Sequence, residues 1–302
     1  MRHLPFKQQQ VLKAWLLLSP MLIVLAWVAA WPQYKSTYFS FTNVSLNDLT
    51  SFEFVAFQNY LDYFDGEWYG VLADPLWWHA VYNTFYFSVI SVSLETIFGL
   101  LIALIIHSNF KGRGIMRAVI LIPWAIPTIV SAKMWGWMLN DQFGIINDLL
   151  MRLSIISEPI AWTSQTNTAM ATIIAVDVWK TTPFMALLIL AGLQTLPKDC
   201  YLVAKVDGIH PVKVFFKVTL PLLKNTILVA VIFRMLDALR IFDLIYVLTP
   251  NNEATISMSV YVRQYLFDFD RFAYGSASST LLFLIISMLT ITFVKVGKLK
   301  LS

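Results

Sequence analysis

Six long runs of apolar residues alternate with polar segments along the chain. A run of about 20 apolar residues can cross the roughly 30 Å hydrocarbon core of a bilayer as an α-helix. The runs lie at residues 14–31, 80–106, 118–139, 168–193, 226–248 and 272–294. The pattern therefore predicts an all-α membrane protein with six transmembrane helices, which form a single domain over residues 1–302.

The first run has a second interpretation as a cleaved secretory signal. Lys7 and Lys13 precede its apolar core, and the small residues Ala29 and Ala30 follow it. However, the run is long for a signal sequence, and five further runs come after it. An uncleaved first helix is the favoured prediction.

The composition also indicates that this protein is surrounded by lipid and not by water. Hydrophobic residues make up 58% of the 302 positions and charged residues 13%, whereas soluble domains carry about 25% charged residues. The single Cys200 excludes an intramolecular disulfide and a multi-cysteine metal site. The four histidines lie far apart, so we expect neither a metal site nor a catalytic site.

Positive charge is distributed unevenly between alternate segments. Fourteen Lys and Arg residues lie in the two termini, the loop after the second run and the segment 196–223 with Lys224, against four in the other segments. Because these residues accumulate on the cytoplasmic side of membrane proteins, both termini and segment 196–223 are predicted to be cytoplasmic. The long acidic segment 40–79 is then extracytoplasmic. Its aromatic residues fit either a membrane-interface belt or a docking surface for a soluble partner.

Eight charged residues lie inside the apolar runs, where each costs at least about 2.5–3.5 kcal/mol to insert. They are Glu95, Lys133, Asp177, Lys180, Arg234, Asp237, Arg240 and Asp243. Asp177 and Lys180 can meet on one helical face, and the last four alternate in sign every three residues. Structural ion pairing is the favoured interpretation of Glu95 and Lys133. For the others, ion pairs between helices and the lining of a wet cavity are both open.

Helix-breaking residues favour a cavity near these charges. Pro123 and Pro127 are expected to kink the third run, and Thr181-Thr182-Pro183 to interrupt the fourth. Trp124 and Phe184 lie beside these positions and offer flat aromatic faces. Such faces, together with hydroxyls and ion-paired side chains, suit the binding of a sugar ring.

No phosphate-binding G-x-x-x-x-G-K-[ST] loop occurs in the sequence. If this chain moves a solute with energy from ATP, another subunit must hydrolyse the nucleotide.

The basic segment 196–223 contains helix start and stop signals. Asp199 is placed as the N-cap of a short amphipathic helix at residues 201–206, and Asp207-Gly208 ends it. A second short segment, 211–218, precedes the next apolar run. A short helix in a cytoplasmic loop is a means by which a partner outside the membrane can move this protein.

The same segment resembles the EAA motif of binding-protein-dependent ABC importer permeases. It reads P-x-D-x-Y-x-x-A-x-x-D-G from Pro197 to Gly208, followed by T-L-P-L-L at residues 219–223. Residues 121–124, 177–185 and 233–249 are similar to the carbohydrate-uptake branch, in particular to the first permease subunit of maltose/trehalose-type systems. The resemblance covers nearly the whole chain. It implies the type I ABC importer permease fold in a bacterial or archaeal cytoplasmic (inner) membrane.

The resemblance implies an ATP-driven sugar importer, in which the chain forms half of the translocation pathway and works by alternating access. Its partners would be a second permease, two ATP-binding subunits that use ATP and Mg²⁺, and an extracytoplasmic sugar-binding protein. Neither a cofactor bound by this chain nor a nucleic acid is expected. The alternatives are a permease for glycerol-phosphate or oligosaccharides and an ion-coupled secondary carrier.

The resemblance also assigns roles to residues. A coupling helix would meet the ATPase through Asp199, Tyr201, Leu202, Ala204, Lys205, Asp207 and Gly208. Leu202 stands where the family has a glutamate. The sugar would be contacted by Trp124, Thr128, Lys180, Thr181, Phe184, Arg234, Asp237 and Ala238. Lys180, Arg234 and Asp237 are charged where the maltose-specific chain is not, which favours a more polar ligand or ion pairs that shape the pocket.

Overall fold

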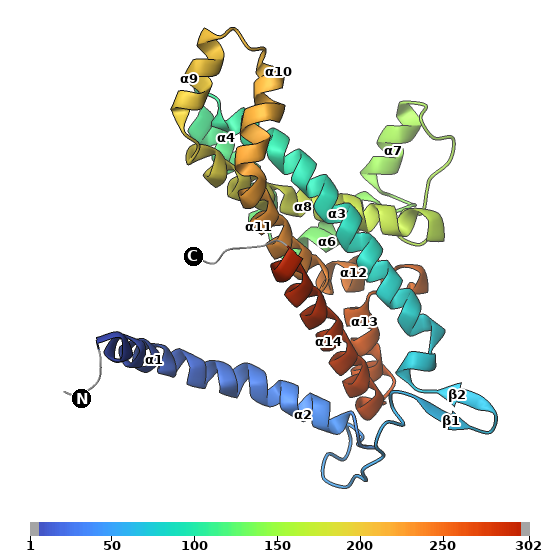
Figure 1. Cartoon of the computed structure of the whole chain (residues 1–302). Helices are drawn as coiled ribbons and strands as arrows, with labels where there is room; N and C mark the ends of the chain where they lie inside the picture. Colours follow the sequence, from blue (N-terminus) through green and yellow to red (C-terminus); the bar gives the residue numbers. More distant parts are fainter. Residues whose placement is uncertain (1–5, 297–302) are drawn as a thin grey trace. The chain divides into compact units, whose positions relative to one another are not determined.

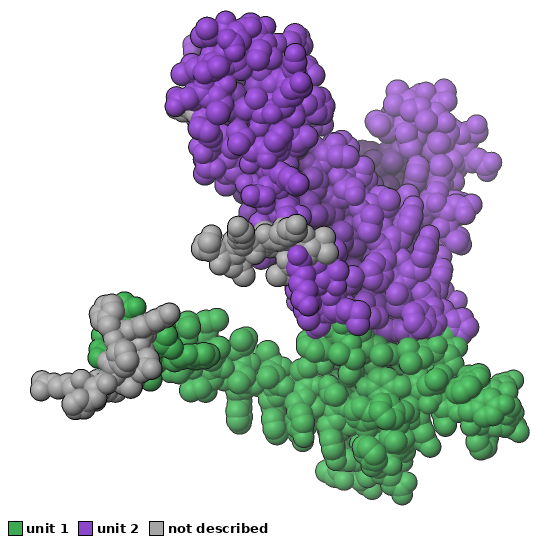
Figure 2. Space-filling view, viewed as in Figure 1, with its two compact units in different colours: residues 1–74, 262–284 green, residues 75–261, 285–302 purple. Residues whose placement is uncertain are grey.

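The computed structural model describes residues 6–296, and the chain divides into two compact units (Figures 1 and 2). Unit 1 contains residues 1–74 and 262–284, and unit 2 contains residues 75–261 and 285–302.

Unit 1 begins with one long apolar helix. It consists of α1 (Phe6–Leu25), a π-helical stretch η1 (Ala26–Ala30) and α2 (Trp31–Phe39). Residues 9–39 are long and apolar enough to cross a membrane. Trp15, Leu17 and Trp27 are all more than half exposed in this helix, which is the pattern of a surface that meets lipid or another membrane helix.

A small β-hairpin follows, which the apolar pattern did not predict. Strand β1 (Asp62–Phe64) pairs antiparallel with β2 (Glu67–Tyr69). Asp65 and Gly66 form the turn with φ values of 50° and 85°, the positive values that a two-residue type I′ turn requires. The short helix η2 (Val71–Ala73) comes directly after Gly70.

The C-terminal part of unit 1 packs on its loops. It contains η5 (Gln264–Asp268) and the first half of α14 (Phe272–Val296), and α13 (Met258–Arg263) leads into it. The Ala273 N–H donates to the Val44 carbonyl at 3.2 Å, and Asn47 Nδ2 donates to Asp270 Oδ2 at 2.6 Å. These bonds join the segment after α2 to the start of α14.

Unit 2 is built on two long helices that pack along each other, α3 (Pro75–His107) and α8 (Thr166–Gln194) (Figure 1). Helix α11 (Leu220–Ala238) packs against both. Gly192 permits this close approach, because a Cβ atom there would lie 2.5 Å from Thr226 Cγ2. The remaining short elements are α7 (Ile145–Arg152) and η4 (Glu253–Thr255).

The third and fifth predicted spans are both broken. Helices α4 (Arg113–Ile120) and α5 (Ile122–Ala125) precede a bend of 88° into α6 (Thr128–Met138). Pro127 lies at this break, so the predicted kink of the third run is present. The prediction of a continuous helix over 226–248 is wrong, because α11 ends at Ala238 and α12 (Asp243–Leu248) starts only after an irregular segment. The charges of that segment lie beside a polar cavity instead of in a helix core.

The fourth span is continuous, so the predicted interruption at residues 181–183 is wrong. Helix α8 runs through Pro183. A proline removes one N–H from the helical ladder, and neighbouring groups in a packed membrane helix can compensate for that loss. Met185 and Ala186 are buried directly after the proline, and their packing holds the helix together.

Segment 196–223 forms a helical hairpin at one end of unit 2 (Figure 1). Helix α9 (Lys198–Val206) is followed by α10 (Pro211–Val214) and the π-helical stretch η3 (Phe215–Thr219). Residues 211–238 form one helix long enough to cross a membrane. The predicted separate segment 211–218 is therefore the first part of the fifth span.

The N-terminal end of α9 differs from the prediction, whereas its C-terminal end agrees with it. Pro197 occupies the N-cap, and Asp199 lies in the first turn without capping the helix. A carboxylate in the first turn is stabilised there by the helix dipole. The predicted stop is present: Gly208 has φ of +67°, its N–H bonds to the Lys205 carbonyl at 3.2 Å, and the Ile209 N–H bonds to the Ala204 carbonyl at 3.0 Å. This is a Schellman cap.

Five helices in residues 6–296 are long and apolar enough to cross a membrane, and the bent pair α4–α5 and α6 makes a sixth if it counts as one span. The predicted all-α membrane fold with six spans is confirmed in this form.

Candidate functional site

A polar cavity of about 200 Å³ lies within unit 2, next to both broken spans. Its walls come from the bend before α6, from the middle of α8, from the C-terminal end of α11 and from the irregular segment before α12. The lining residues are Trp124, Thr128, Asp177, Lys180, Thr181, Arg234, Asp237, Ala238, Arg240, Ile241, Phe242, Asp243 and Leu244. Irregular backbone inside a membrane protein is tolerated where it lines such a cavity.

Seven of the eight residues expected to contact substrate line this cavity. The eighth, Phe184, lies directly behind it. Its ring stacks on the Trp124 ring with centroids 5.6 Å apart and planes 13° apart. The structure thus brings the whole predicted set together from three separate parts of the sequence.

Arg234 is the centre of a buried ion-pair network. Its Nε atom donates to Glu95 Oε2 at 2.6 Å, and its Nη2 atom donates to Asp177 Oδ2 at 2.5 Å. The Arg234 and Glu95 side chains are 4% and 0% exposed. Because a buried guanidinium is costly without partners, these two carboxylates explain why an arginine is tolerated here.

Two hydroxyl groups complete the network. The Ser91 hydroxyl lies 2.6 Å from Asp177 Oδ2 and 2.9 Å from Glu95 Oε1. The Thr181 hydroxyl lies 2.7 Å from Glu95 Oε1. Glu95 therefore has a structural ion pair, as the sequence indicated. Ser91 was missed, although its position one turn before Glu95 on the same helical face was a signal for it.

The third partner of Arg234 is Asp237, and it is in a different environment. Arg234 Nη1 donates to Asp237 Oδ2 at 2.8 Å, but the Asp237 side chain is 70% exposed. One face of this carboxylate is held by Arg234, and the rest is open to the cavity. Asp237 is thus positioned by the network and available to a ligand.

The other charged residues of the cavity have no ion-pair partner among residues 6–296. These are Lys180, Arg240 and Asp243. The expected pairing of Lys180 with Asp177 is not formed, because Asp177 binds Arg234. The cavity and its network together contain three cations and four carboxylates, which gives a formal charge of −1. Such a dense and almost neutral set of donors and acceptors can bind a ligand rich in hydroxyl groups.

The residues expected in the coupling helix fall into two groups. Tyr201 and Ala204 pack inward: the Tyr201 hydroxyl donates to Thr219 Oγ1 at 3.1 Å, and Ala204 is buried. Asp199, Leu202, Lys205, Asp207 and Gly208 are exposed on α9 and its cap. Leu202 is 61% exposed next to Val203 at 59%, so α9 presents an apolar surface that its own chain does not cover.

Long apolar helices, two broken spans and a polar cavity between them define a multi-pass membrane component of a transport system. Residues 95–297 match the model of a family described as the binding-protein-dependent transport system inner membrane component. The chain belongs to this family. It is a multi-pass inner-membrane permease and not itself an ATPase.

Relatives across nearly the whole chain support this assignment. The chain is 44% identical over 249 residues to the trehalose/maltose transport system permease protein MalF of Thermococcus litoralis, which covers 82% of this chain and 81% of that protein. It is 36% identical to the sulfoquinovosyl glycerol transport system permease protein SmoG of Agrobacterium fabrum, with 96% and 91% covered. It is 34% identical to the trehalose transport system permease protein SugA of Mycobacterium tuberculosis, with 93% and 87% covered.

The fold is that of an ABC importer permease. A chain in the crystal structure of a bacterial ABC transporter involved in the import of the acidic polysaccharide alginate matches with a TM-score of 0.78. The match covers 98% of both chains at 19% sequence identity. The predicted family and fold are therefore confirmed.

Proposed function

We propose that this chain is a permease subunit of an ATP-driven importer for a saccharide of the trehalose/maltose class, and that the unit 2 cavity is its contribution to the substrate path. The observation that carries the proposal is the cavity itself, in which Trp124, stacked on Phe184, lines the same space as the charged side chains Lys180, Arg240 and Asp243. The names of two relatives, which include trehalose, agree with this substrate class.

In the proposed complex, Trp124 stacks on the C–H face of a sugar ring and Phe184 supports it from behind. Trp124 is 46% exposed, so one of its faces is available to a ligand. The hydroxyls of the sugar bond to Asp237 and Lys180, with Thr128 as a further partner and Ala238 leaving room for the ring. Arg234 and Thr181 already form bonds to the Glu95 carboxylate. Their proposed role is to hold the α8 and α11 walls of the cavity in place.

The distribution of charge favours a neutral saccharide over glycerol-phosphate. A phosphate ester would meet four carboxylates in and around the cavity, and Arg234 already has three of them as partners. Only Lys180 and Arg240 would be free to compensate the phosphate charge. A polyhydroxylated neutral ligand needs no such compensation, because its hydroxyls can both donate to carboxylates and accept from cations.

We further propose that α9 is the coupling helix and that both termini and the α9–α10 hairpin are cytoplasmic. The exposed Leu202 and Val203 and the 86% exposed Val206 suit insertion into an apolar groove of an ATP-binding subunit. Two such subunits would use ATP and Mg²⁺. A second permease and an extracytoplasmic sugar-binding protein would complete the importer.

The α9–α10 hairpin has a direct mechanical connection to the cavity. The Tyr201–Thr219 hydrogen bond fixes α9 to the helix of residues 211–238. That helix has 28 residues, about 42 Å at 1.5 Å per residue, and its far end carries Arg234, Asp237 and Ala238. A displacement of α9 by the ATPase would therefore be transmitted to the cavity wall, as alternating access requires.

Uptake by the reconstituted importer tests this proposal. The chain would be assembled in proteoliposomes with its second permease, the ATP-binding subunits and the cognate binding protein, and radiolabelled trehalose and maltose would be supplied outside. We expect uptake that requires ATP in the lumen and is unchanged when an ionophore removes the membrane potential. Uptake that survives removal of ATP and stops with the potential would favour an ion-coupled carrier and contradict the proposal.

A further inference from the structure

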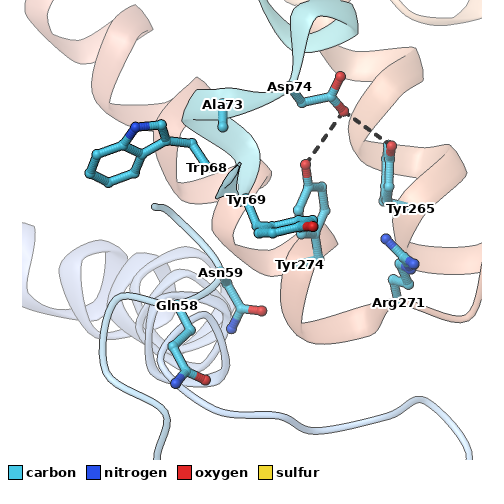
Figure 3. Close-up of a pocket in the computed structure, with 10 residues that line it drawn as sticks. Gln58, Asn59, Trp68, Tyr69, Ala73, Asp74, Tyr265, Arg271 and Tyr274 are labelled. Atoms are coloured by element: carbon cyan, nitrogen blue, oxygen red, sulfur yellow. Dashed lines mark hydrogen bonds between the residues drawn. The ribbon is translucent and has the colours of Figure 1, made fainter. Parts of the chain in front are cut away.

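A second polar cavity lies entirely within unit 1 and has a volume of about 350 Å³ (Figure 3). Its walls come from residues 58–59, the strand β2, the helix η2, the stretch η5 and the start of α14. The coupling and transport roles proposed above make no use of it. Its volume is within the range of about 300–1,000 Å³ that small-molecule sites occupy.

One wall of this cavity is a carboxylate that holds two tyrosines. Asp74 Oδ2 accepts hydrogen bonds from the Tyr265 hydroxyl at 3.2 Å and from the Tyr274 hydroxyl at 3.4 Å (Figure 3). The two tyrosine rings lie 4.6 Å apart, with their planes 34° apart. The wall is therefore an ordered set of oxygen atoms backed by aromatic carbon.

Two further lining residues, Asn59 and Arg271, offer hydrogen-bonding groups that have no partner in residues 6–296. Asn59 Nδ2 donates to the carbonyls of Ser40 and Thr42 at 2.9 and 2.8 Å, which fixes the amide and leaves its Oδ1 as a free acceptor. The Arg271 guanidinium forms no hydrogen bond or ion pair with residues 6–296, although it lines the cavity beside Tyr265 (Figure 3). Donors and acceptors thus converge on one space.

Trp68 and Tyr69 of β2 both border this cavity, but as successive strand residues they point to opposite faces of the hairpin, and the Tyr69 ring is the one beside Tyr274 (Figure 3). Trp68 is 61% exposed and Tyr69 is 48% exposed. Trp68 is held by Tyr63 on the neighbouring strand, with ring centroids 4.9 Å apart. The half-exposed Tyr69 ring beside the convergent polar groups has the composition of a site that stacks on a sugar ring and forms hydrogen bonds with its hydroxyls.

We propose that this cavity is a second saccharide-binding subsite, which takes one ring of a neutral sugar on the extracytoplasmic side. Tyr69 contacts the C–H face of the ring, while Arg271, Asn59 and the Asp74 wall bond its hydroxyls. The lining contains one guanidinium, Arg271, and one carboxylate, Asp74, so it is formally neutral, which disfavours a phosphate or another anion. This inference rests on the saccharide substrate and on the membrane orientation proposed above.

Saturation-transfer difference NMR with trehalose tests the subsite. The probe would be added to the assembled transporter in lipid nanodiscs, in the absence of the binding protein and in the Asp237→Ala background, which is expected to weaken sugar binding in the unit 2 cavity. We expect trehalose binding to persist in that background and to weaken roughly fivefold with Tyr69→Ala, the size of one aromatic contact. Arg271→Gln is the second variant, and as a substitution of an exposed residue it keeps the test valid if Tyr69→Ala fails to assemble.

Phe64→Ala is the matched control, because Phe64 is a 72% exposed aromatic residue of the same hairpin that does not line the cavity. It should leave trehalose binding unchanged. Trehalose binding and uptake KM that are the same in Tyr69→Ala, Arg271→Gln and wild type would overturn the subsite while the proposed function stands. Failure of the wild-type importer to take up sugar would instead count against the proposed function. Weaker docking of the sugar-free binding protein with unchanged sugar binding would also overturn the subsite, since the cavity would then be a protein contact.

Discussion

Arg234 and Glu95 are 139 positions apart in the sequence, and the Arg234 Nε atom donates to Glu95 Oε2 at 2.6 Å. Both side chains are almost completely buried. Neither charge would be stable at its position without the other, because an unpaired buried ion pays a large desolvation cost. This pair joins α3 to α11 directly beneath the cavity, so the stability of the bundle and the shape of the cavity depend on the same contact.

Replacing Arg234 should destabilise the protein strongly. Arg234→Met leaves Glu95 and Asp177 as buried carboxylates without a cation, and breaking such a pair costs about 3–5 kcal/mol. We expect a large loss of thermal stability of the detergent-solubilised chain, measured by fluorescence-detected size exclusion after heating. Arg152→Met is the control, because Arg152 is 77% exposed and pairs with an exposed Asp148 at 3.0 Å. Exposed pairs contribute about 0–1 kcal/mol, so equal melting of both variants would contradict the network.

Replacing Asp237 should affect transport more than folding. Its carboxylate is largely exposed to the cavity and contacts Arg234 on one side only. Asp237→Ala should raise the uptake KM roughly tenfold, the effect of losing one hydrogen bond to a charged group. Binding of the ATP-binding subunits, measured by co-purification, should remain. Uptake with an unchanged KM would place Asp237 among the purely structural residues.

The two stacked rings, Trp124 and Phe184, should contribute unequally to sugar binding. Trp124→Ala removes the face proposed to contact the sugar, whereas Phe184→Ala removes only its support. Both should raise the uptake KM, and Trp124→Ala should do so more strongly, by roughly fivefold to tenfold. Phe233→Ala serves as the comparison, because Phe233 is 63% exposed and does not line the cavity. An equal effect of all three substitutions would indicate a general loss of packing.

The cap of α9 can be tested at Gly208. Its φ of +67° lies in the left-handed region, and there is open space where a side chain would begin. Gly208→Ala should therefore act through backbone strain alone, about 1 kcal/mol, and should weaken binding of the ATP-binding subunits by up to roughly fivefold. Gly114→Ala is the matched control, because Gly114 also has open space but an ordinary helical φ.

Deletion of residues 199–208 is the stronger form of the α9 test. It should abolish co-purification with the ATP-binding subunits. Retention of these subunits at wild-type levels after the deletion would mean that α9 is not the coupling helix.

Much of this protein was determined by its sequence alone. The apolar runs predicted the long membrane helices of residues 6–296, although not the end of the fifth at Ala238, because the need to cross about 30 Å of hydrocarbon is a local and additive property of a segment. The bend at Pro127 and the cap at Gly208 were also predictable from the local sequence, because each depends on the φ values that one residue allows. The Asp65-Gly66 turn of the hairpin carried an equally local signal. It was missed because the segment around it has no long apolar run.

The tertiary structure decided which charges meet. Asp177 could have paired with Lys180 one turn away, but it pairs with Arg234, which lies 57 residues further along the chain. The run of residues 226–248 did not show that α11 ends at Ala238, and the structure places the irregular segment after that end on the wall of the polar cavity. In a helix that is apolar on all sides, periodicity does not distinguish the face toward lipid from the face toward protein. The partners of a buried charge therefore follow from the packing of α3, α8 and α11, and no single stretch of sequence contains that information.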